Sequence, residues 1–317
     1  MRVIGIFNRD GGTFKTTDMD AFSVRAVEIF TAAGHQLETR VVEGKSLIAE
    51  LENAAQAAEL LLAGGGDGTI SAAAAAAYKH NIPLAVVPAG TMNLFARSLS
   101  IPLKLEDALM ALAAGEIKQV DIATANGQPF IHQFSVGIHA KMVKLRASLP
   151  YKNRIGKMLA STRAAFGAIL NPPSFSIDVL AKGRLERRSI GGLAVSNNPL
   201  DEGHLPLADR LDRGVLGIYL VPPLTLPVMI RLAWGILRGK FRSLPEIIDK
   251  EAREATIFFP RKKSGSMAVI DGELIRLSDR LDLKIHPRAL SVMVPKAEAE
   301  TPPADDSKGL AKLLASA

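Results

Sequence analysis

Two glycine turns, each between a short apolar run and a helical pattern, constrain the fold of this chain most strongly. Residues 64–69 follow the apolar run 59–63, and residues 88–91 follow the run 83–87, about 25 residues further on. Short β-rich runs that alternate with helical patterns predict parallel βαβ units. Because the carboxyl ends of parallel strands meet at one edge of a sheet, we expect both turns to border one ligand site.

Two kinds of segment follow each other along the chain and predict two domains. The further elements expected in the first part are strands at 3–8 and 36–42 and helices at 19–33 and 46–58. Beyond about residue 125, short alternating segments separated by turn residues are typical of an antiparallel β sandwich or barrel. We expect an α/β domain with a parallel sheet over 1–125 and a β-sandwich domain over 126–295. Residues 296–317 predict a flexible tail, whose beginning packs back on the first domain.

The absence of cysteine narrows the classes of function. The 317 residues contain no Cys, which excludes disulfides, thiolate nucleophiles and zinc–thiolate sites and indicates a reducing compartment. The first residues lack the apolar region of a signal peptide, and no run of about 18 uncharged apolar residues occurs. We therefore expect a cytoplasmic protein without a membrane span.

Positive charge is concentrated in two segments. Lys and Arg number 39 against 32 Asp and Glu, a net charge of +7. The acid-free interval 122–177 holds Lys141, Lys144, Arg146, Lys152, Arg154, Lys157 and Arg163. Segment 224–242 joins apolar residues and Trp234 to Arg231, Arg238, Lys240 and Arg242. Such surfaces attract phosphates, nucleic acid or anionic lipid, although a solvated helix face is an equal alternative.

The first glycine turn has the composition of a phosphate site. In Gly65-Gly66-Asp67-Gly68-Thr69, the glycines let backbone N–H groups approach an anion, and the following helix offers its positive end. Asp67 would repel a bare phosphate, so a magnesium-bound nucleotide fits the turn better. A tight turn with a helix-capping Asp is the structural alternative.

Three motifs in order resemble the diacylglycerol kinase catalytic family, which includes sphingosine kinases and bacterial lipid kinases. They are Gly65-Gly66-Asp67-Gly68-Thr69, the segment from Pro88-Ala89-Gly90-Thr91-Met92-Asn93 to Arg97, and Asp271-Gly272-Glu273. Weaker similarity covers Val120-Asp121-Ile122 and extends to about residue 295. The resemblance implies an N-terminal nucleotide-binding α/β domain, a C-terminal β sandwich, and an active site between them.

The resemblance also implies roles for individual residues. Those expected around ATP are Asn8, Gly65, Gly66, Asp67, Gly68, Thr69, Thr91 and Asn93, with Asp67 close to the Mg²⁺. Either Asp271 or Glu273 would take the proton from a lipid hydroxyl, and Lys15 and Asp121 would form a charged network with Glu273. Phosphoryl transfer needs positioning and charge neutralisation more than covalent chemistry, so such a set suffices. Without the other motifs, Asp271-Gly272 would simply predict a hairpin turn.

Two departures from the family pattern affect these expectations. The first motif of the family usually begins Asn-Pro, whereas this chain has Asn8-Arg9-Asp10-Gly11-Gly12. Bacterial lipid kinases hold a structural magnesium near a paired Asp-Asp-Gly, where this chain has Asp212-Arg213-Gly214. We therefore expect that metal site to be lost.

The sequence leaves several alternatives open. The leading hypothesis is an ATP-dependent kinase that phosphorylates diacylglycerol or a related lipid at the anionic inner face of a membrane, with no nucleic-acid partner. A NAD kinase-like enzyme and a non-catalytic lipid- or nucleotide-binding regulator are the alternatives. The acceptor lipid and the oligomeric state, with a homodimer as one option, stay open. The six histidines show no metal-ligand spacing, and we interpret them as surface or satisfied core residues.

Overall fold

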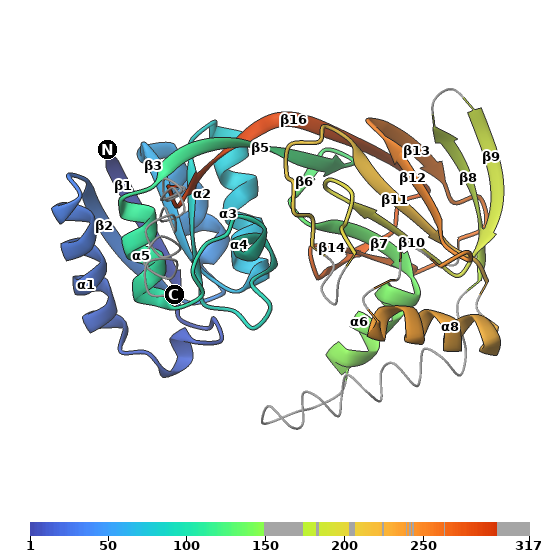
Figure 1. The fold of residues 1–317 in the computed structure, drawn as a ribbon, viewed down its shortest axis with the longest axis horizontal. Coiled ribbons are helices and arrows are strands. Elements are labelled where there is room, and N and C mark those ends of the chain that lie inside the picture. The colour runs from blue at the N-terminus through green and yellow to red at the C-terminus, as the bar shows by residue number, and fades with distance from the viewer. Residues whose placement is uncertain are drawn as a thin grey trace, which may run out of the picture.

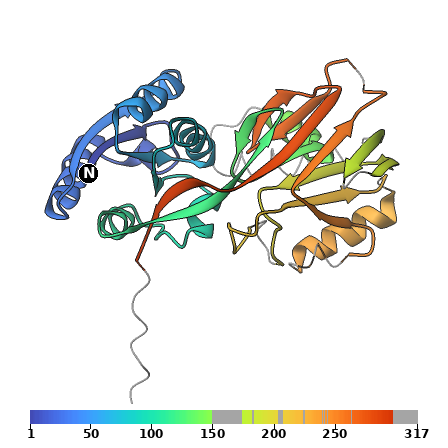
Figure 2. The same ribbon diagram turned by 90° about the horizontal axis from the view of Figure 1, so that it is seen from above.

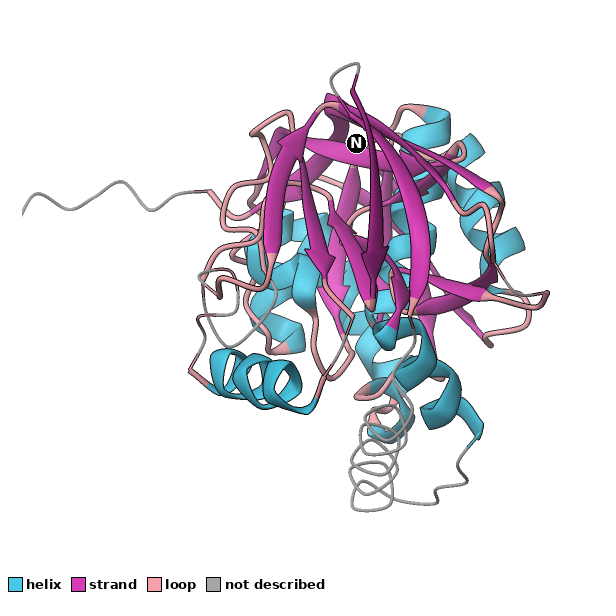
Figure 3. Cartoon of the chain, turned by 90° about the vertical axis from the view of Figure 1, so that its right-hand side faces the viewer, coloured by secondary structure: helices cyan, strands magenta, loops and turns pink. Residues whose placement is uncertain are grey.

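The computed structural model describes residues 1–148, 174–181, 184–202, 207–223, 225–238, 240, 242, 244–262 and 264–296. Two bodies lie next to each other and are joined by two long strands (Figure 1). The N-terminal body is a parallel sheet with helices, and the C-terminal body consists of two antiparallel sheets (Figures 1 and 3). The predicted fold class, an α/β domain followed by a β sandwich, is confirmed.

The first body has the parallel βαβ order that the sequence predicts. Its elements are β1 (Arg2–Asn8), η1 (Phe14–Thr16), α1 (Met19–Ala32), β2 (Gln36–Val42), α2 (Leu47–Ala57), β3 (Leu60–Gly65), α3 (Asp67–His80), β4 (Leu84–Pro88), α4 (Leu94–Ser98) and α5 (Leu105–Ala113). The strands lie in the order β2-β1-β3-β4, all parallel. β3 and β4 are buried along their whole length, as expected for central strands covered on both faces. The small side chains of α3 let it pack closely, since Ala73, Ala74 and Ala77 are fully buried.

The second body is a sandwich of two sheets around one core. Its strands are β6 (Gln128–Phe130), β7 (Gln133–Gly137), β8 (Phe175–Ala181), β9 (Arg184–Ile190), β10 (Gly192–Ser196), β11 (Leu216–Val221), β12 (Ile248–Ala252), β13 (Glu254–Phe258), β14 (Met267–Ile270) and β15 (Glu273–Arg276). One sheet has the order β12-β11-β10-β7-β14-β15, and β13, β8 and β9 belong to the facing sheet. Inward side chains of both sheets, such as Ile177, Ile257, Val195 and Ile218, share the core.

Two strands cross between the bodies, and the sequence did not predict either of them as a continuous element. β5 (Glu116–Ala125) pairs with β16 (Arg280–Val294) along both bodies, as Figure 2 shows from above. The register shifts between His286 and Leu290, so a bulge marks the passage from one body to the other.

The two cores divide the chain differently from the predicted boundary at 125. The end of β16, including Leu290, Val292 and Met293, belongs to the core of the first body, whereas Ala123 and Ala125 belong to that of the second. The return of the chain to the first domain therefore begins before residue 295. Apart from Lys296, the predicted tail 296–317 lies outside the described residues.

Two helices lie at the same end of the sandwich, α6 (Ile138–Ser148) and α8 (Leu226–Leu237) (Figures 1 and 3). They correspond to the two basic segments of the sequence, of which 149–173 is outside the described part. Among the described residues, no helix is both long and apolar enough to cross a bilayer.

Candidate active site

Three glycine-containing turns of the first domain meet in backbone contact. A Cβ at Gly11, in the turn after β1, would lie 3.3 Å from the Cα of Gly65. A Cβ at Gly90, in the turn after β4, would lie 2.7 Å from the Cα of Gly66. Since real Cβ atoms do not approach backbone this closely, Gly90 must be a glycine. The turn after β1, which departs from the family pattern, thus keeps the close approach through its glycine.

The N-terminus of α3 offers free backbone donors to this junction. The helix begins at Asp67, and the preceding Gly66 provides no side-chain cap. The first N–H groups of a helix lack partners within it, and they attract anions. The first glycine turn therefore has the geometry of a phosphate site.

The carboxylate of Asp67 ties the two main glycine turns together. Its Oδ2 accepts the N–H of Asn93 (3.1 Å), and its Oδ1 accepts the N–H of Leu94 (2.7 Å). Asp67 thus caps α4 rather than its own helix. Because two carboxylate oxygens have about four acceptor positions, this leaves capacity for a magnesium ion beside a nucleotide.

Three of the predicted nucleotide-binding side chains hold the turns in shape. Asn8 donates through Nδ2 to Oγ1 of the buried Thr69 (2.9 Å). Asn93 Oδ1 accepts the N–H of Gly90 (2.8 Å), and its Nδ2 donates back to the carbonyl of Gly90 (3.1 Å). By contrast, Thr91 is exposed and available to a ligand. Asn8, Thr69 and Asn93 therefore shape the site from within.

The second domain contributes the hairpin between β14 and β15. Its two-residue turn is Asp271-Gly272, with φ of 44° and 91°. Positive φ at both positions is the signature of a type I′ hairpin turn, which is why Asp-Gly forms it. The hairpin alternative is thus correct, and it is compatible with a functional role.

The carboxylate of Asp271 is fully engaged as an anchor. Oδ1 accepts the N–H groups of His132 (3.0 Å) and Gln133 (2.9 Å), and Oδ2 accepts the N–H of Ile131 (2.9 Å). Oδ2 also accepts the hydroxyl of Ser71 from α3 (2.6 Å). Ser71 was not predicted from the sequence, since a single Ser on a helix gives no signal. Through Ser71, Asp271 connects the hairpin to the helix of the first glycine turn.

Glu273 is the exposed carboxylate of the hairpin, and it reaches the first glycine turn. A Cβ at Gly68 would lie 3.2 Å from Oε1 of Glu273. The residue comes from the second domain, 205 positions along the chain from Gly68. The structure therefore brings Glu273, but not a free Asp271 oxygen, to the first glycine turn.

The structure does not bring Asp121 into a network with Lys15 and Glu273. Asp121 is fully buried at the crossing of β5 and β16, where it accepts the N–H groups of Gly214 (2.6 Å) and Arg288 (2.8 Å). The φ of Arg288 is 52°, within the bulge. Asp121 therefore stabilises the passage between the domains. Lys15, on η1, is exposed.

His132 does not fit the expectation that the histidines are surface residues or core residues with hydrogen-bond partners. Part of the residue reaches the surface, but its Nε2 is buried and has no hydrogen-bond partner among the described residues. Burial lowers the pKa of His132, and the carboxylates of Asp271 and Asp67 oppose this effect. An uncharged imidazole therefore lies near both aspartates.

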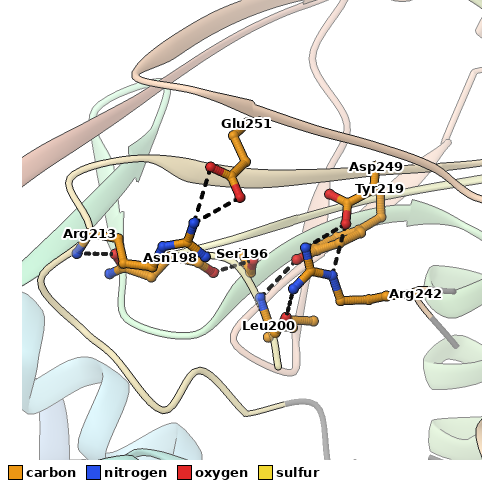
Figure 4. Close-up of polar contacts among 8 residues, drawn as sticks. All are labelled: Ser196, Asn198, Leu200, Arg213, Tyr219, Arg242, Asp249 and Glu251. Atoms are coloured by element: carbon orange, nitrogen blue, oxygen red, sulfur yellow. Dashed lines mark hydrogen bonds and ion pairs between the residues drawn. The ribbon is translucent and has the colours of Figure 1, made fainter. Parts of the chain in front are cut away.

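In the stretch Asp212-Arg213-Gly214, the side chain of the exposed Arg213 is paired with a carboxylate of the same domain (Figure 4). The guanidinium of Arg213 donates to both carboxylate oxygens of Glu251 (3.1 and 3.3 Å), and its backbone N–H donates to Asn198 (2.9 Å). In the described part of the chain, no three His, Cys, Asp or Glu side chains group to hold a metal. At the position where the Asp-Asp-Gly pattern has its second carboxylate, this chain thus has a guanidinium paired with Glu251.

Comparison with known proteins agrees with this arrangement. Residues 2–125 match the family model of the diacylglycerol kinase catalytic domain. The chain is 26% identical over 298 residues to the diacylglycerol kinase of Bacillus subtilis strain 168, covering 87% of this chain and 91% of that protein. It is 28% identical over 304 residues to the "Probable lipid kinase YegS-like" protein of Pseudomonas aeruginosa strain UCBPP-PA14, covering 89% and 93%. A shorter match, 40% identical over 98 residues, covers 22% of the length of an uncharacterized Synechocystis protein.

The fold is shared with a solved structure. The crystal structure of a diacylglycerol kinase from Bacillus anthracis strain Sterne aligns with a TM-score of 0.66 at 18% identity, covering 93% of this chain and 97% of that one. Residues 2–125 thus match the diacylglycerol kinase catalytic domain, and most of the chain is similar to proteins named diacylglycerol kinase and lipid kinase. The catalytic-domain match and the named relatives support a lipid kinase role.

Proposed function

We propose that this protein transfers the γ-phosphate of ATP to the hydroxyl group of diacylglycerol or a related lipid. The observation that carries the proposal is the position of Glu273, whose carboxylate lies over Gly68 at the start of α3. A proton acceptor and a phosphate-binding helix terminus thus face each other across the domain boundary.

The residues have distinct tasks in this reaction. The N–H groups at the start of α3 bind the phosphates, and the exposed Thr91 and Lys15 lie in the neighbouring turns to add polar and cationic contacts. Magnesium bound beside Asp67 would supply neutralisation of phosphate charge. Glu273 accepts the proton of the lipid hydroxyl. At the same time the hydroxyl oxygen bonds to the γ-phosphorus, and the bond from that phosphorus to the ADP oxygen breaks.

The direct test is incubation of the protein with γ-labelled ATP, magnesium and a panel of lipids in mixed micelles. We expect the label on a lipid with a free hydroxyl, and no transfer to NAD. Label on NAD would favour the NAD kinase-like alternative. Nucleotide binding without transfer to any lipid would favour the non-catalytic regulator.

The proposal includes reversible docking of α8 on an anionic membrane surface. The exposed residues Pro227, Ile230, Arg231 and Trp234 follow helical spacing and form one face of α8, which Arg238 continues directly after the helix. Ile230 and Trp234 are 52% and 56% exposed. Arg238 lies over the Trp234 ring at 5.1 Å, and Arg231 forms an ion pair with Glu246. An exposed Trp among cations suits the headgroup region of a bilayer.

The structure shows which basic residues a docking experiment should replace. Arg242 is half-buried against the sandwich, where it forms an ion pair with Asp249 (2.6 Å) and its guanidinium lies 5.8 Å from the Tyr219 ring (Figure 4). The informative variant therefore replaces only Arg238 and Lys240 by Gln, with Arg276→Gln as a control at an exposed cation outside α8. Co-sedimentation with vesicles should require anionic lipid, weaken with salt and fall in that double variant. Equal binding to neutral vesicles would refute electrostatic docking.

A further inference from the structure

A second hollow lies where α6 packs against the β sandwich, apart from the glycine turns. Its volume is about 700 Å³, within the range of roughly 300–1,000 Å³ that is usual for small-molecule sites. It is lined from α6, from the ends of β7, β8 and β14, and from the segments that follow β13 and β15.

The inner wall of this cavity is apolar. The side chains that form it are Val136, Ala140, Phe175, Phe259, Met267 and Leu277. The rings of Phe175 and Phe259 lie 6.2 Å apart, and Phe259 is almost fully buried. Such a wall offers contact area to an acyl chain.

Cations surround the cavity, and none of its described lining residues is acidic. Lys141, Lys144, Arg261 and Lys262 line it. Lys262 forms an ion pair with Asp279 (3.1 Å), which lies outside the lining. Lys144 and Arg261 are exposed, and no ion pair involves either within the described residues. The cavity therefore combines an apolar wall with uncompensated positive charge.

The cavity is separated from the site of phosphoryl transfer by the length of a hairpin. Asp271 and Glu273 lie at the turn of β14 and β15, whereas Met267 and Leu277 lie at the open end. Four residues of extended chain separate Glu273 from Leu277, which corresponds to about 13 Å. A ligand whose charged group is held by Lys144 and Arg261 therefore has that group too far from Glu273 to react there.

We propose that this cavity binds an anionic amphiphile, a long acyl chain that carries a carboxylate or a phosphate. The apolar wall holds the chain, and Lys144 and Arg261 hold the anionic group. A neutral acceptor lipid would leave both cations without a partner. This site is distinct from the proposed transfer site, and its occupancy does not depend on phosphoryl transfer.

The test uses the full-length protein and the fluorescent polyene fatty acid cis-parinarate, whose emission rises on burial. Binding is followed by displacement with oleate, oleoyl lysophosphatidate, oleyl alcohol and octanoate, each below its aggregation concentration. We expect both long-chain anions to displace the probe at least about tenfold better than oleyl alcohol, which lacks the charge. The better of the two identifies the headgroup. Oleyl alcohol or octanoate acting as well as oleate would overturn the proposal.

Variants locate the binding. Lys144→Gln with Arg261→Gln should weaken oleate binding about tenfold and leave oleyl alcohol unchanged. Met267→Trp should fill the cavity and reduce binding of both, with circular dichroism as the check of folding. Lys284→Gln, at an exposed cation on β16 outside the cavity, is the control for the loss of a surface cation. Unchanged oleate binding in the charge variant, or an equal loss in the control, would overturn the assignment. Because the readout is binding, its failure is distinguishable from a failure of the kinase proposal.

Discussion

Two turns, one from each domain, each contain an aspartate that accepts backbone N–H groups. Among the described residues, the first aspartate accepts hydrogen bonds only from its own domain, whereas the second also accepts one from the other domain. Asp67 follows β3 and accepts N–H groups from Asn93 and Leu94 in its own domain. Asp271 follows β14 and accepts N–H groups from its own domain and also the hydroxyl of Ser71 from the other. The first turn joins two glycine turns of one domain, and the second connects the two domains. An aspartate in such a motif can therefore act by placing its neighbours, and we propose that the chemistry falls to Glu273.

Replacement of Asp67 should have a large effect on activity. In Asp67→Asn only one amide oxygen remains to accept N–H groups, and the charge that suits magnesium is gone. We expect transfer to fall by more than about a hundredfold, while the protein stays folded. Labelled-ATP assays and urea unfolding measure the two effects. Activity within about tenfold of the wild-type value, the scale of a peripheral contact, would contradict the role of Asp67.

Replacement of Asp271 should have the largest effect on stability. Asp271→Asn places an NH₂ group against buried backbone donors, and we expect a loss of about 2–4 kcal/mol in the free energy of unfolding. Ser71→Ala removes one of the four donors and should cost about 1 kcal/mol. Urea unfolding of both variants measures these differences. If Asp271→Asn unfolds like the wild type, Asp271 is no anchor.

Close packing of the glycine turns predicts a smaller, position-specific effect. In Gly90→Ala the new Cβ would meet the Cα of Gly66 at 2.7 Å, so the turns must separate. We expect a loss of about 1–3 kcal/mol in stability and weaker ATP binding, measured by urea unfolding and calorimetric titration. Gly44→Ala is the control, because its Cβ would meet only the side chain of Asp10, at 3.4 Å. Equal effects in both variants would show that the contact is unimportant.

The lowered pKa of His132 predicts that the free energy of unfolding depends modestly on pH. Its pKa is lowered in the folded protein by burial, so the unfolded chain binds the proton first as pH falls below the ordinary value near 6.5. Stability should therefore decrease with acidification below that pH, by at most about 1.4 kcal/mol per pH unit from this residue. Urea unfolding between pH 5 and 7 should show a smaller slope for His132→Gln than for the wild type. An identical slope would exclude His132 as its source.

The sequence predicted the first turn better than the second for a physical reason. Strands β1 to β4 and their glycine turns are local, since each turn follows directly from its own strand and helix. The roles of Asp121 and Asp271 depend on partners more than 90 residues away, such as Gly214 and Ser71. The continuous β5 and β16 were not predicted, because both cross between two cores and their apolar pattern changes at the crossing.

Glu273→Gln tests most directly whether Glu273 is the base of the proposed reaction, because the variant removes the proposed proton acceptor and leaves Asp67 and Asp271 in place. Turnover and ATP affinity should be measured on the same preparation, by single-turnover transfer from labelled ATP to diacylglycerol and by calorimetric titration. If Glu273 is the base, we expect transfer to fall by about 10²–10⁴ while ATP affinity and the free energy of unfolding stay at wild-type values. Near wild-type transfer, or lost ATP binding with unchanged chemistry, would contradict the assignment of Glu273 as the base.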